Sequence, residues 1–206
     1  VVLDWTPNTN HTGLYVADAL GYFKAEGLEV KILQPAGGTA EQLVATGKAQ
    51  FGISYQESVT FARIQSLPIV SIAAIIQHNT SGFAALKSKG IKRPKDWAGK
   101  NYGGWGSPVE EATLKALIEK DGGKVNSINI LTTGSADFFQ SSKSSVYFAW
   151  VYEGWTNIEE KLKGFEIDYI PLNKYEKALD YYTPVIITNE KIATKDKDLA
   201  KKFMKA

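Results

Sequence analysis

Residues 103–106 form a Gly-Gly-Trp-Gly turn directly before Ser107 and a helix-like segment. Glycine permits tight turns and a close approach to the backbone that a Cβ would prevent. Ser107 is a suitable helix cap, and free N–H groups at the start of a helix can receive a negative or carbonyl-bearing group. The turn therefore indicates a ligand contact or, equally well, glycines that only tighten packing. Its spacing fits neither the dinucleotide fingerprint nor a phosphate-binding P-loop.

Aromatic, amide and acidic side chains gather where the expected strands end. A single aromatic residue in a strand is more often part of the core, but the joint placement of so many favours a ligand site. Aromatic faces with a few hydrogen-bonding groups suit a flat, neutral or weakly charged heterocycle, and amides or carboxylates can pair with an amino-substituted ring edge. The candidate ligand-binding residues are Trp5, Asn8, His11, Tyr15, Gly38, Tyr55, Gln56, Gly104, Trp105, Gly106, Ser107, Trp150, Tyr152 and Glu153.

The two histidines, His11 and His78, give no case for catalysis or metal binding. No Gly-x-Ser-x-Gly nucleophile elbow occurs, and no His, Asp or Glu cluster has the spacing of a metal site. Glu110 and Glu111 suit the first turn of a helix, where acids interact favourably with the helix dipole. Glu153 is surrounded by aromatic residues and is the favoured ligand-facing acid. We therefore expect a binding site without catalytic residues, metal or cofactor.

The composition is that of an ordinary soluble globular protein. Of its 206 residues, 44% are hydrophobic and 22% charged, and the formal charge of +2 gives no electrostatic case for binding nucleic acid. The absence of cysteine excludes disulfides, thiolate zinc sites and cysteine nucleophiles. No apolar run reaches the length of about 18 residues that spans a membrane. Because the chain opens in a strand-like segment and stops in a helix-like one, we expect a trimmed piece whose export signal lies outside it.

Hydrophobic periodicity predicts strands that alternate with helices. The expected strands are 1–5, 27–33, 51–54, 69–76, 82–86, one ending at 101–102, 128–131, 146–149, 165–171 and 185–187. The expected helices are 14–24, 40–46, 57–65, 109–120, 136–141, 158–162 and one that starts near Asp198. This alternation argues for a mostly parallel sheet with helices on both faces, whose ligands lie beyond the carboxyl ends of the strands.

A lysine-rich change of composition at residues 87–94 suggests a boundary between two α/β lobes. We expect lobe 1 to comprise residues 1–86 and a return segment, 184–206, that is truncated. Lobe 2, residues 87–183, is then inserted into lobe 1. A cleft is expected where the strand ends of both lobes meet.

Several blocks of the sequence contain motifs that are typical of one protein family. Leu-Asp-Trp-Thr-Pro-Asn at residues 3–8 leads into His-Thr-Gly-Leu-Tyr-Val-Ala at 11–17, Gly-Lys-Ala-Gln-Phe-Gly-Ile stands at 47–53, and Trp-Val-Tyr-Glu stands at 150–153. They resemble the thiamine-pyrimidine-precursor family, which contains ABC-transporter substrate-binding proteins and a fungal pyrimidine synthase. Residues 103–111 most resemble the bacterial transport branch that carries formylaminopyrimidine, a thiamine breakdown product.

The resemblance implies a type II periplasmic-binding-protein fold and delivery of the ligand to a membrane permease. It also implies that Trp5 and an aromatic residue at Trp150 or Tyr152 stack on the pyrimidine. Glu153 would accept from the amino group, and the turn at 104–107 would hold a polar substituent. We thus expect a monomeric, non-catalytic, extracytoplasmic protein, periplasmic or a membrane-tethered lipoprotein, that closes two lobes over an aminopyrimidine.

Two alternatives stay open at this point. The first is a pyrimidine synthase-like enzyme, because His11 matches a synthase position where a histidine is consumed as substrate; the cysteine-rich iron-binding run of that branch is replaced here by residues 180–185. The second keeps the fold but changes the ligand to riboflavin, an amine or a sulfonate. Arg63 and Arg93 are the only arginines, which disfavours an arginine-anchored sulfonate.

Overall fold

A computed structural model describes residues 1–125, 128–133 and 145–206. The chain forms two compact units. Unit 1 comprises Val1–His78 and Tyr181–Ala206, and unit 2 comprises Asn79–Asp180. The helix expected at 136–141 lies outside the described residues.

The sheet of unit 1 has three strands in the order β1-β8-β2, which are β1 (Phe51–Ser54), β8 (Val185–Asn189) and β2 (Ile69–Ala74). The central strand β8 is antiparallel to both neighbours. It returns from unit 2 with Val185 opposite Ala74, the last residue of β2, and so runs back along the strand from which the chain left. The expectation of a mostly parallel sheet is therefore wrong here, because the chain enters β8 beside the end of β2 and runs antiparallel to it.

Two strands expected near the N-terminus are shortened to isolated bridges. Val2 pairs in parallel with Leu33 on one side and with Gly52 of β1 on the other. The N–H of Ile53 donates to the carbonyl of Val2 at 2.9 Å. Because this pairing is parallel, the segment 4–11 lies beyond the carboxyl end of β1.

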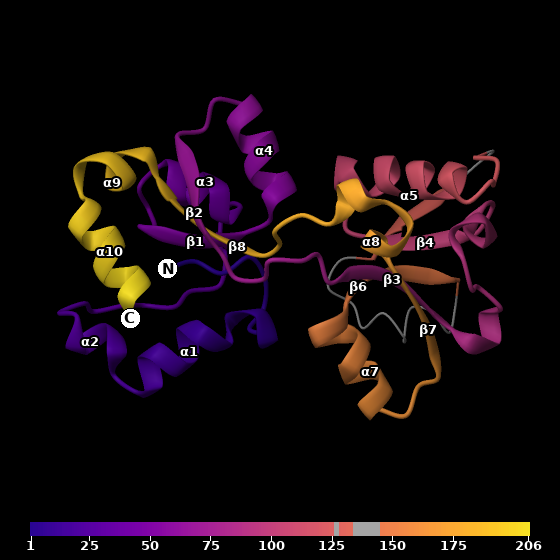
Figure 1. The fold of residues 1–206 in the computed structure, drawn as a ribbon, viewed down its shortest axis with the longest axis horizontal. Coiled ribbons are helices and arrows are strands. Elements are labelled where there is room, and N and C mark those ends of the chain that lie inside the picture. Colours follow the sequence, from indigo (N-terminus) through magenta and orange to yellow (C-terminus); the bar gives the residue numbers. More distant parts are fainter. Residues whose placement is uncertain (126–127, 134–144) are drawn as a thin grey trace. The chain divides into compact units, whose positions relative to one another are not determined.

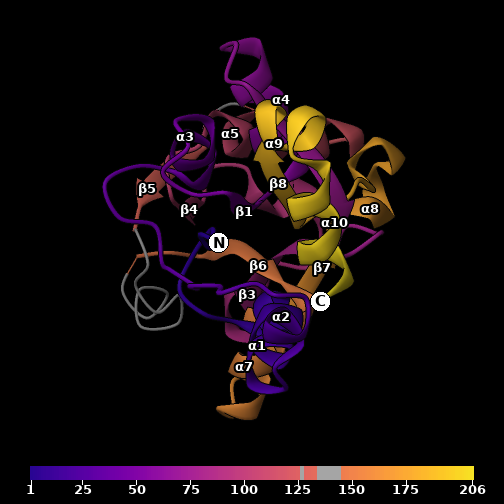
Figure 2. The same ribbon diagram turned by 90° about the vertical axis from the view of Figure 1, so that its left-hand side faces the viewer.

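Helices cover both faces of the unit 1 sheet (Figure 1). They are η1 (Thr9–His11), α1 (Thr12–Ala19), α2 (Tyr22–Ala25), α3 (Ala40–Ala45), α4 (Gln56–Ile64), α9 (Glu190–Lys195) and α10 (Lys197–Lys205). Strand β8 alternates between two cores: Val185 and Ile187 belong to the core with α3 and α4, whereas Ile186 packs in the core with α1, α2 and α10. Figure 2 likewise shows α3 and α1 on opposite sides of β1.

The single helix expected at residues 14–24 is in fact two helices. Between α1 and α2, Gly21 adopts a left-handed conformation with φ 72°, and α2 begins at Tyr22. Glycine takes this conformation without the steric penalty of a Cβ. Helix α9 is not predicted by the hydrophobic pattern. It depends on a local cap, because the Asn189 side chain accepts from the N–H of Lys191 at 2.8 Å.

Among its described residues, unit 2 has a sheet of five strands in the order β5-β4-β6-β3-β7. They are β3 (Ser81–Leu86), β4 (Asn101–Gly104), β5 (Asn129–Thr132), β6 (Phe148–Tyr152) and β7 (Ile167–Pro171). β4 is parallel to β5 and β6, whereas β3 is antiparallel to β6 and β7, so this sheet is mixed. The expected lobe boundary after residue 86 puts β3 in lobe 1, but the backbone of β3 pairs in unit 2, where Phe83 stands opposite Trp150.

An aromatic core lies on one face of the unit 2 sheet. Its centre is Phe83, whose ring centroid lies 4.5 Å from that of Trp97 and 5.9 Å from that of Phe148. Leu114 and Leu117 of α5 complete this core. The helices in the described part of unit 2 are η2 (Lys87–Lys89), η3 (Pro94–Trp97), α5 (Pro108–Lys120), the π-helical η4 (Glu153–Asn157), α7 (Ile158–Leu162), α8 (Leu172–Tyr175) and η5 (Lys177–Leu179). Figure 1 shows α5 and α7 on opposite sides of this sheet.

Candidate ligand-binding site

Strand β6 carries aromatic side chains from the core of unit 2 to the edge of its sheet. Phe148, Trp150 and Tyr152 point to the same face because side chains alternate along a strand. Phe148 is fully buried, whereas Trp150 and Tyr152 are partly exposed. Trp150 still contacts Phe83, with ring centroids 5.3 Å apart. The aromatic core therefore continues to the carboxyl end of β6 and becomes accessible there.

Two further tryptophans join this edge. Trp105, which follows β4 and is 42% exposed, meets Trp150 edge to face, with ring centroids 5.4 Å apart and planes at 82°. Trp155, which follows β6, stacks on Tyr152 with ring centroids 6.2 Å apart and planes at 16°. Trp155 lies in the π-helical turn η4, and such turns are frequent at functional sites. The edge thus presents several ring faces to a planar ligand.

The indole N–H of Trp150 is a buried donor with no acceptor among the described residues. Leaving such a group unpaired costs about 1–3 kcal/mol. Trp97 has an unpaired N–H as well, but its ring is fully buried in the core, where a ligand has no access. Trp150 stands at the partly exposed edge, although its N–H itself is buried, so a ligand acceptor would reach this donor only if neighbouring side chains moved.

Glu153 provides an acceptor next to these rings. Its side chain is 42% exposed, accepts a hydrogen bond from the Asn157 amide and has the Lys161 ammonium 3.8 Å away. Asn157 is fully buried. Burial, followed by the charge of Glu153, raises the pKa of Tyr169, whose hydroxyl donates to the carbonyl of Thr80 at 2.8 Å. The buried amide therefore holds one oxygen of Glu153 in place while the carboxylate stays accessible.

The turn before α5 is filled by the carboxylate of Glu110. Its Oε1 accepts from the Tyr102 hydroxyl at 2.6 Å and from the N–H of Trp105 at 3.1 Å. Its Oε2 accepts from the N–H of Ser107 at 2.7 Å. Ser107 Oγ in turn accepts from the N–H of Val109 at 3.3 Å. The expectation of free N–H groups at this turn is therefore wrong for Trp105, Ser107 and Val109, because each of their N–H groups donates to a side chain of the same segment.

Burial and close packing hold this arrangement in place. Glu110 is fully buried. Burial, followed by the negative charge of Glu110, raises the pKa of Tyr102 well above its ordinary value, so the phenol keeps the proton that it donates. A Cβ on Gly104 would stand 2.3 Å from Glu110 Oε1 and 2.7 Å from the Tyr102 ring. Position 104 therefore requires glycine, because the carboxylate lies directly against the backbone.

In unit 1, the segment after the Val2 bridge carries a buried hydrogen-bond network. Asp4 Oδ1 lies 2.6 Å from His11 Nε2, and Asp4 Oδ2 accepts from the Tyr55 hydroxyl. His11 Nδ1 accepts from the N–H of Asn8 at 3.2 Å, so the proton of the neutral ring lies on Nε2 and is donated to Asp4. His11 is fully buried and both of its ring nitrogens are bonded, so in this arrangement it links Asp4 to the backbone of Asn8.

Two acids lie beside the carboxyl end of β1. The Ser54 hydroxyl donates to Glu41 of α3. Glu57 lies in the first turn of α4, and its Oε2 is buried with no hydrogen-bond partner among the described residues. Burial, with a smaller contribution from the charge of Glu41, raises the pKa of Glu57 from 4.5 to about 7. Glu57 thus combines a raised pKa with a buried oxygen that has no hydrogen-bond partner among the described residues.

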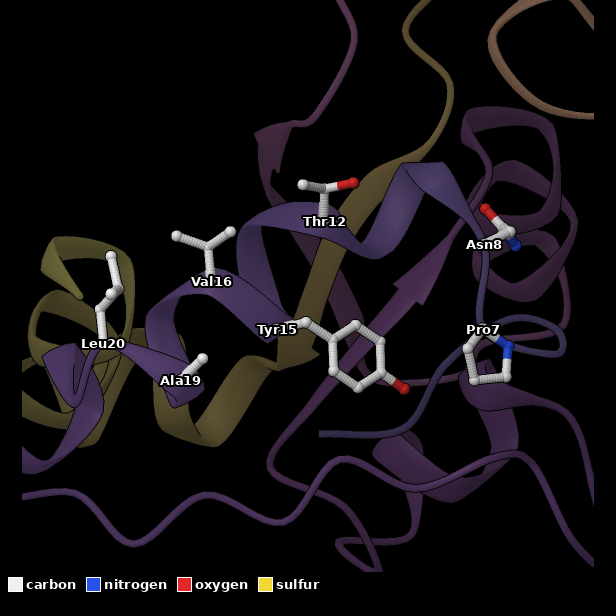
Figure 3. Close-up of a pocket in the computed structure, with 7 residues that line it drawn as sticks. All are labelled: Pro7, Asn8, Thr12, Tyr15, Val16, Ala19 and Leu20. Carbon is white, nitrogen blue, oxygen red and sulfur yellow. The ribbon is translucent and has the colours of Figure 1, made fainter. Parts of the chain in front are cut away.

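An apolar groove of about 440 Å³ runs along α1, lined by Pro7, Asn8, Thr12, Tyr15, Val16, Ala19 and Leu20. Figure 3 shows the Tyr15 ring extending toward Pro7, with Val16 and Leu20 farther along the helix. Two predicted site residues, Asn8 and Tyr15, line this groove. Its side chains are mainly apolar and offer few groups that would orient a polar heterocycle.

The structure groups the predicted residues by unit. The edge of the unit 2 sheet brings together Gly104, Trp105, Gly106, Ser107, Trp150, Tyr152 and Glu153. In unit 1, the Asp4 network joins Asn8, His11 and Tyr55. Trp5 is partly exposed in the same segment, Gly38 is exposed, and Gln56 accepts from the N–H of Tyr182 at 3.1 Å.

Several residues of these sites lie outside the predicted set, among them Asp4, Glu57 and Asn157. The spacing of Asp4 and His11 has no regular period, so no local pattern predicts their contact. Glu57 follows a predicted residue, but its burial depends on the tertiary structure. Asn157 had a usable signal, because residues four apart face each other on a helix and Asn157 lies four after Glu153.

The described parts of the chain contain neither a metal-binding cluster nor a helix that could cross a membrane. There, no three His, Asp or Glu side chains are arranged to hold a metal ion. Likewise, no helix within the described ranges combines the length and the apolar character needed to cross a bilayer.

Residues 8–206 match the protein family described as NMT1/THI5 like. The chain is 31% identical over 215 residues to the formylaminopyrimidine-binding protein of Halalkalibacterium halodurans, an alignment that covers 100% of this chain and 63% of that protein. It is 32% identical over 104 residues to the 4-amino-5-hydroxymethyl-2-methylpyrimidine phosphate synthase of Legionella pneumophila, which covers 50% of this chain and 33% of the synthase. The chain thus spans less than two thirds of the length of either relative.

The fold is similar to that of the periplasmic aliphatic sulphonate binding protein of Escherichia coli. The TM-score is 0.73 at 13% identity, and the match covers 98% of this chain and 64% of that one. At this identity the likeness concerns the fold alone, and it confirms the predicted α/β fold class of the type II periplasmic binding proteins. The family resemblance that the motifs indicate is confirmed as well: the chain belongs to the NMT1/THI5-like family.

Proposed function

We propose that this chain is the solute-binding component of an ABC importer for a thiamine pyrimidine precursor, N-formyl-4-amino-5-aminomethyl-2-methylpyrimidine. The similarity of the whole chain to a formylaminopyrimidine-binding protein supports the proposal. Such a component works outside the cytoplasm, free in the periplasm or tethered to the membrane, and delivers its ligand to a permease without altering it.

The observation that carries the proposal is the placement of a donor and an acceptor among aromatic rings at the edge of the unit 2 sheet. Trp150 offers a buried N–H without an acceptor among the described residues, and Glu153 offers an accessible carboxylate. A 4-aminopyrimidine is complementary, because its ring nitrogens accept hydrogen bonds and its amino group donates them. Trp105 and Tyr152 would supply ring faces for stacking.

The contributions of unit 1 are proposals of the same kind. Trp5 stays a predicted stacking residue, and the network of Asp4 and His11 would order the loop that carries it. Glu57 would accept a hydrogen bond from a ligand donor. Closure of the two lobes on ligand binding also stays a prediction. Small-angle X-ray scattering checks it, because closure reduces the radius of gyration when ligand is added.

Calorimetric titration with the formylaminopyrimidine tests the proposed site. A charge-assisted hydrogen bond contributes about 1.5–3 kcal/mol, so we expect Glu153→Gln to weaken binding by about 10- to 100-fold. Trp150→Phe keeps an aromatic ring but removes the N–H donor, and it should weaken binding by about tenfold. Glu159→Gln is the matched control, because Glu159 is an exposed acid of the neighbouring helix α7 that pairs with Lys163 at 2.9 Å.

The possible outcomes test the identity of the ligand and the location of the site separately. If the unmodified protein binds riboflavin or an alkanesulfonate but not the pyrimidine, the ligand assignment is wrong. If the pyrimidine binds equally well to the Glu153→Gln and Glu159→Gln proteins, Glu153 is not its acceptor.

The second candidate function is that of a pyrimidine synthase, which is supported by the synthase name of a relative that matches half of the chain. The burial of His11, with both ring nitrogens bonded, disfavours its use as a substrate. Incubation with pyridoxal phosphate and iron, followed by mass spectrometry for a pyrimidine product, tests the enzyme directly. We expect no product, and repeated turnover would establish the synthase instead.

A further inference from the structure

Glu110 occupies the position that a bound anion would take at the start of α5. The first turn of this 13-residue helix directs N–H groups and the positive end of the helix dipole toward that position. The bond from the Ser107 N–H to Glu110 at 2.7 Å is part of an ordinary capping box. The bonds from the Trp105 N–H and the Tyr102 hydroxyl are additional, and they complete a shell of donors around one carboxylate.

The shell leaves few hydrogen-bond donors for a second anion. Both oxygens of Glu110 accept hydrogen bonds, which is the pattern of an ionised carboxylate. The side chain is fully buried, so water screens its charge poorly. A phosphate or sulfonate that approached the turn would find the Trp105 and Ser107 N–H groups taken. It would also meet a charge of its own sign.

We propose that Glu110 is a specificity-determining residue that closes this turn to anions, so that the protein binds neutral or cationic pyrimidines and rejects their phosphate esters. The inference rests on the proposed function, which brings the ligand to Trp105. The distinction concerns two forms of one ring, since relatives of this chain are named as synthases of a pyrimidine phosphate. Glu110 thus contributes to ligand choice without contacting the ligand.

The first test needs no pyrimidine. Inorganic phosphate is titrated into ¹⁵N-labelled protein, and the amide signals of Trp105 and Ser107 are followed by NMR. We expect Glu110→Ala to bind phosphate at this turn, with a saturable shift of both signals and an affinity about tenfold or more above that of the unmodified protein. Glu111→Gln is the matched control, because Glu111 is in the same helical turn, is 53% exposed and loses the same charge.

The second test compares 4-amino-5-hydroxymethyl-2-methylpyrimidine with its phosphate ester by calorimetry. We expect the unmodified protein to prefer the neutral compound on the order of a hundredfold. Glu110→Gln, which keeps the size of the side chain and loses its charge, should reduce this preference to about tenfold or less. Tyr102→Phe removes one hydrogen bond but keeps the charge, and it should leave the preference unchanged. This series also serves if Glu110→Ala fails to fold.

The two tests keep the inference apart from the proposed function. If phosphate shifts the Trp105 and Ser107 signals equally in the Glu110→Ala and Glu111→Gln proteins, the turn is not closed by Glu110 and the inference is wrong. An unchanged preference in Glu110→Gln overturns it as well. If neither pyrimidine binds the unmodified protein, the proposed ligand is wrong, and the phosphate titration still decides whether Glu110 closes the turn.

Discussion

Glu57 and Glu110 occupy corresponding places in the two units but have opposite surroundings. Each lies in the first turn of the helix that follows a strand, α4 after β1 and α5 after β4. Glu110 accepts three hydrogen bonds. Glu57 has a buried oxygen without a partner among the described residues, and burial raises its pKa to about 7. An acid at the start of a helix is therefore fully hydrogen-bonded in one unit and has an unpartnered oxygen among the described residues in the other.

The tyrosines near these acids explain much of the difference. The hydroxyl of Tyr102 donates to Glu110, whereas the hydroxyl of Tyr55 donates to Asp4. Gly104 also lets the carboxylate of Glu110 lie against the backbone. In unit 1 the residue at the end of β1 is Ser54, whose hydroxyl bonds to Glu41. The nearby hydroxyls thus serve other acids, and Glu57 Oε2 is left without a partner among the described residues.

The largest effect expected from this comparison is on stability. Glu110→Ala leaves one hydroxyl and two N–H groups without their acceptor, and it should lower the free energy of unfolding by about 3–4 kcal/mol. Glu57→Ala removes a carboxyl group of which one buried oxygen has no partner among the described residues, and it should cost less than about 1 kcal/mol. Urea denaturation followed by circular dichroism measures both. Equal losses would show that the two acids do not differ in their structural contribution.

The pH dependence of stability should come next in size. The pKa of Glu57 is about 7 in the folded protein against 4.5 as its ordinary value, so unfolding releases a proton between these limits. The free energy of unfolding should therefore fall by roughly 2–3 kcal/mol as the pH rises from 4.5 to 7, and then level off.

Glu57→Gln removes this titration, so we expect its stability to match that of the unmodified protein near pH 4.5 and to exceed it at pH 8. Urea midpoints across this range provide the measurement. Glu41→Gln is the control, because the charge of Glu41 is a minor cause of the shift and its removal should reduce the slope only slightly. A slope that persists in Glu57→Gln would assign the dependence to other groups.

A smaller effect is expected from a methyl group placed beneath Glu110. Gly104→Ala brings a Cβ within 2.3 Å of Glu110 Oε1, so the carboxylate must move, at a cost of about 2 kcal/mol. Gly13→Ala is the matched control, because position 13 lies in α1 and has no atom within 4 Å of the added Cβ. Alanine should stabilise that helix by up to about 0.5–1 kcal/mol. Similar thermal midpoints for both variants would contradict the close packing at 104.

The fold class follows from the sequence because it depends on local periodicity. The expected helices at 40–46 and 109–120 and the strand at 51–54 agree with the structure, since each has a cap or a clear hydrophobic pattern. Strand direction does not follow from the same signals. β8 runs antiparallel because the chain returns from unit 2 beside β2, and this depends on the connection between distant segments.

The candidate site shows the same division. The sequence predicts that the tryptophans and Glu153 lie at strand ends, because the residue type and the position relative to each strand can be identified there. The sequence does not predict the hydrogen-bond partners of their polar atoms. Whether Glu110 fills its own turn depends on Tyr102, which lies eight residues earlier on the preceding strand β4, and on the space left by Gly104. The sequence therefore predicts which side chains gather at an edge, and the structure distinguishes the satisfied groups from the available ones.

The smallest effect compares the two tyrosines. Tyr102→Phe and Tyr55→Phe each remove one hydroxyl that donates to a carboxylate. Tyr102 is fully buried, so Glu110 cannot replace the lost bond with water, and we expect a cost of about 1.5 kcal/mol. Tyr55 is partly exposed, and water can reach its position, so the cost should be about 0.5 kcal/mol. Urea midpoints of the two variants give the order, and a larger loss for Tyr55→Phe would mean that the Asp4 network, and not the turn at Glu110, is the more tightly held of the two.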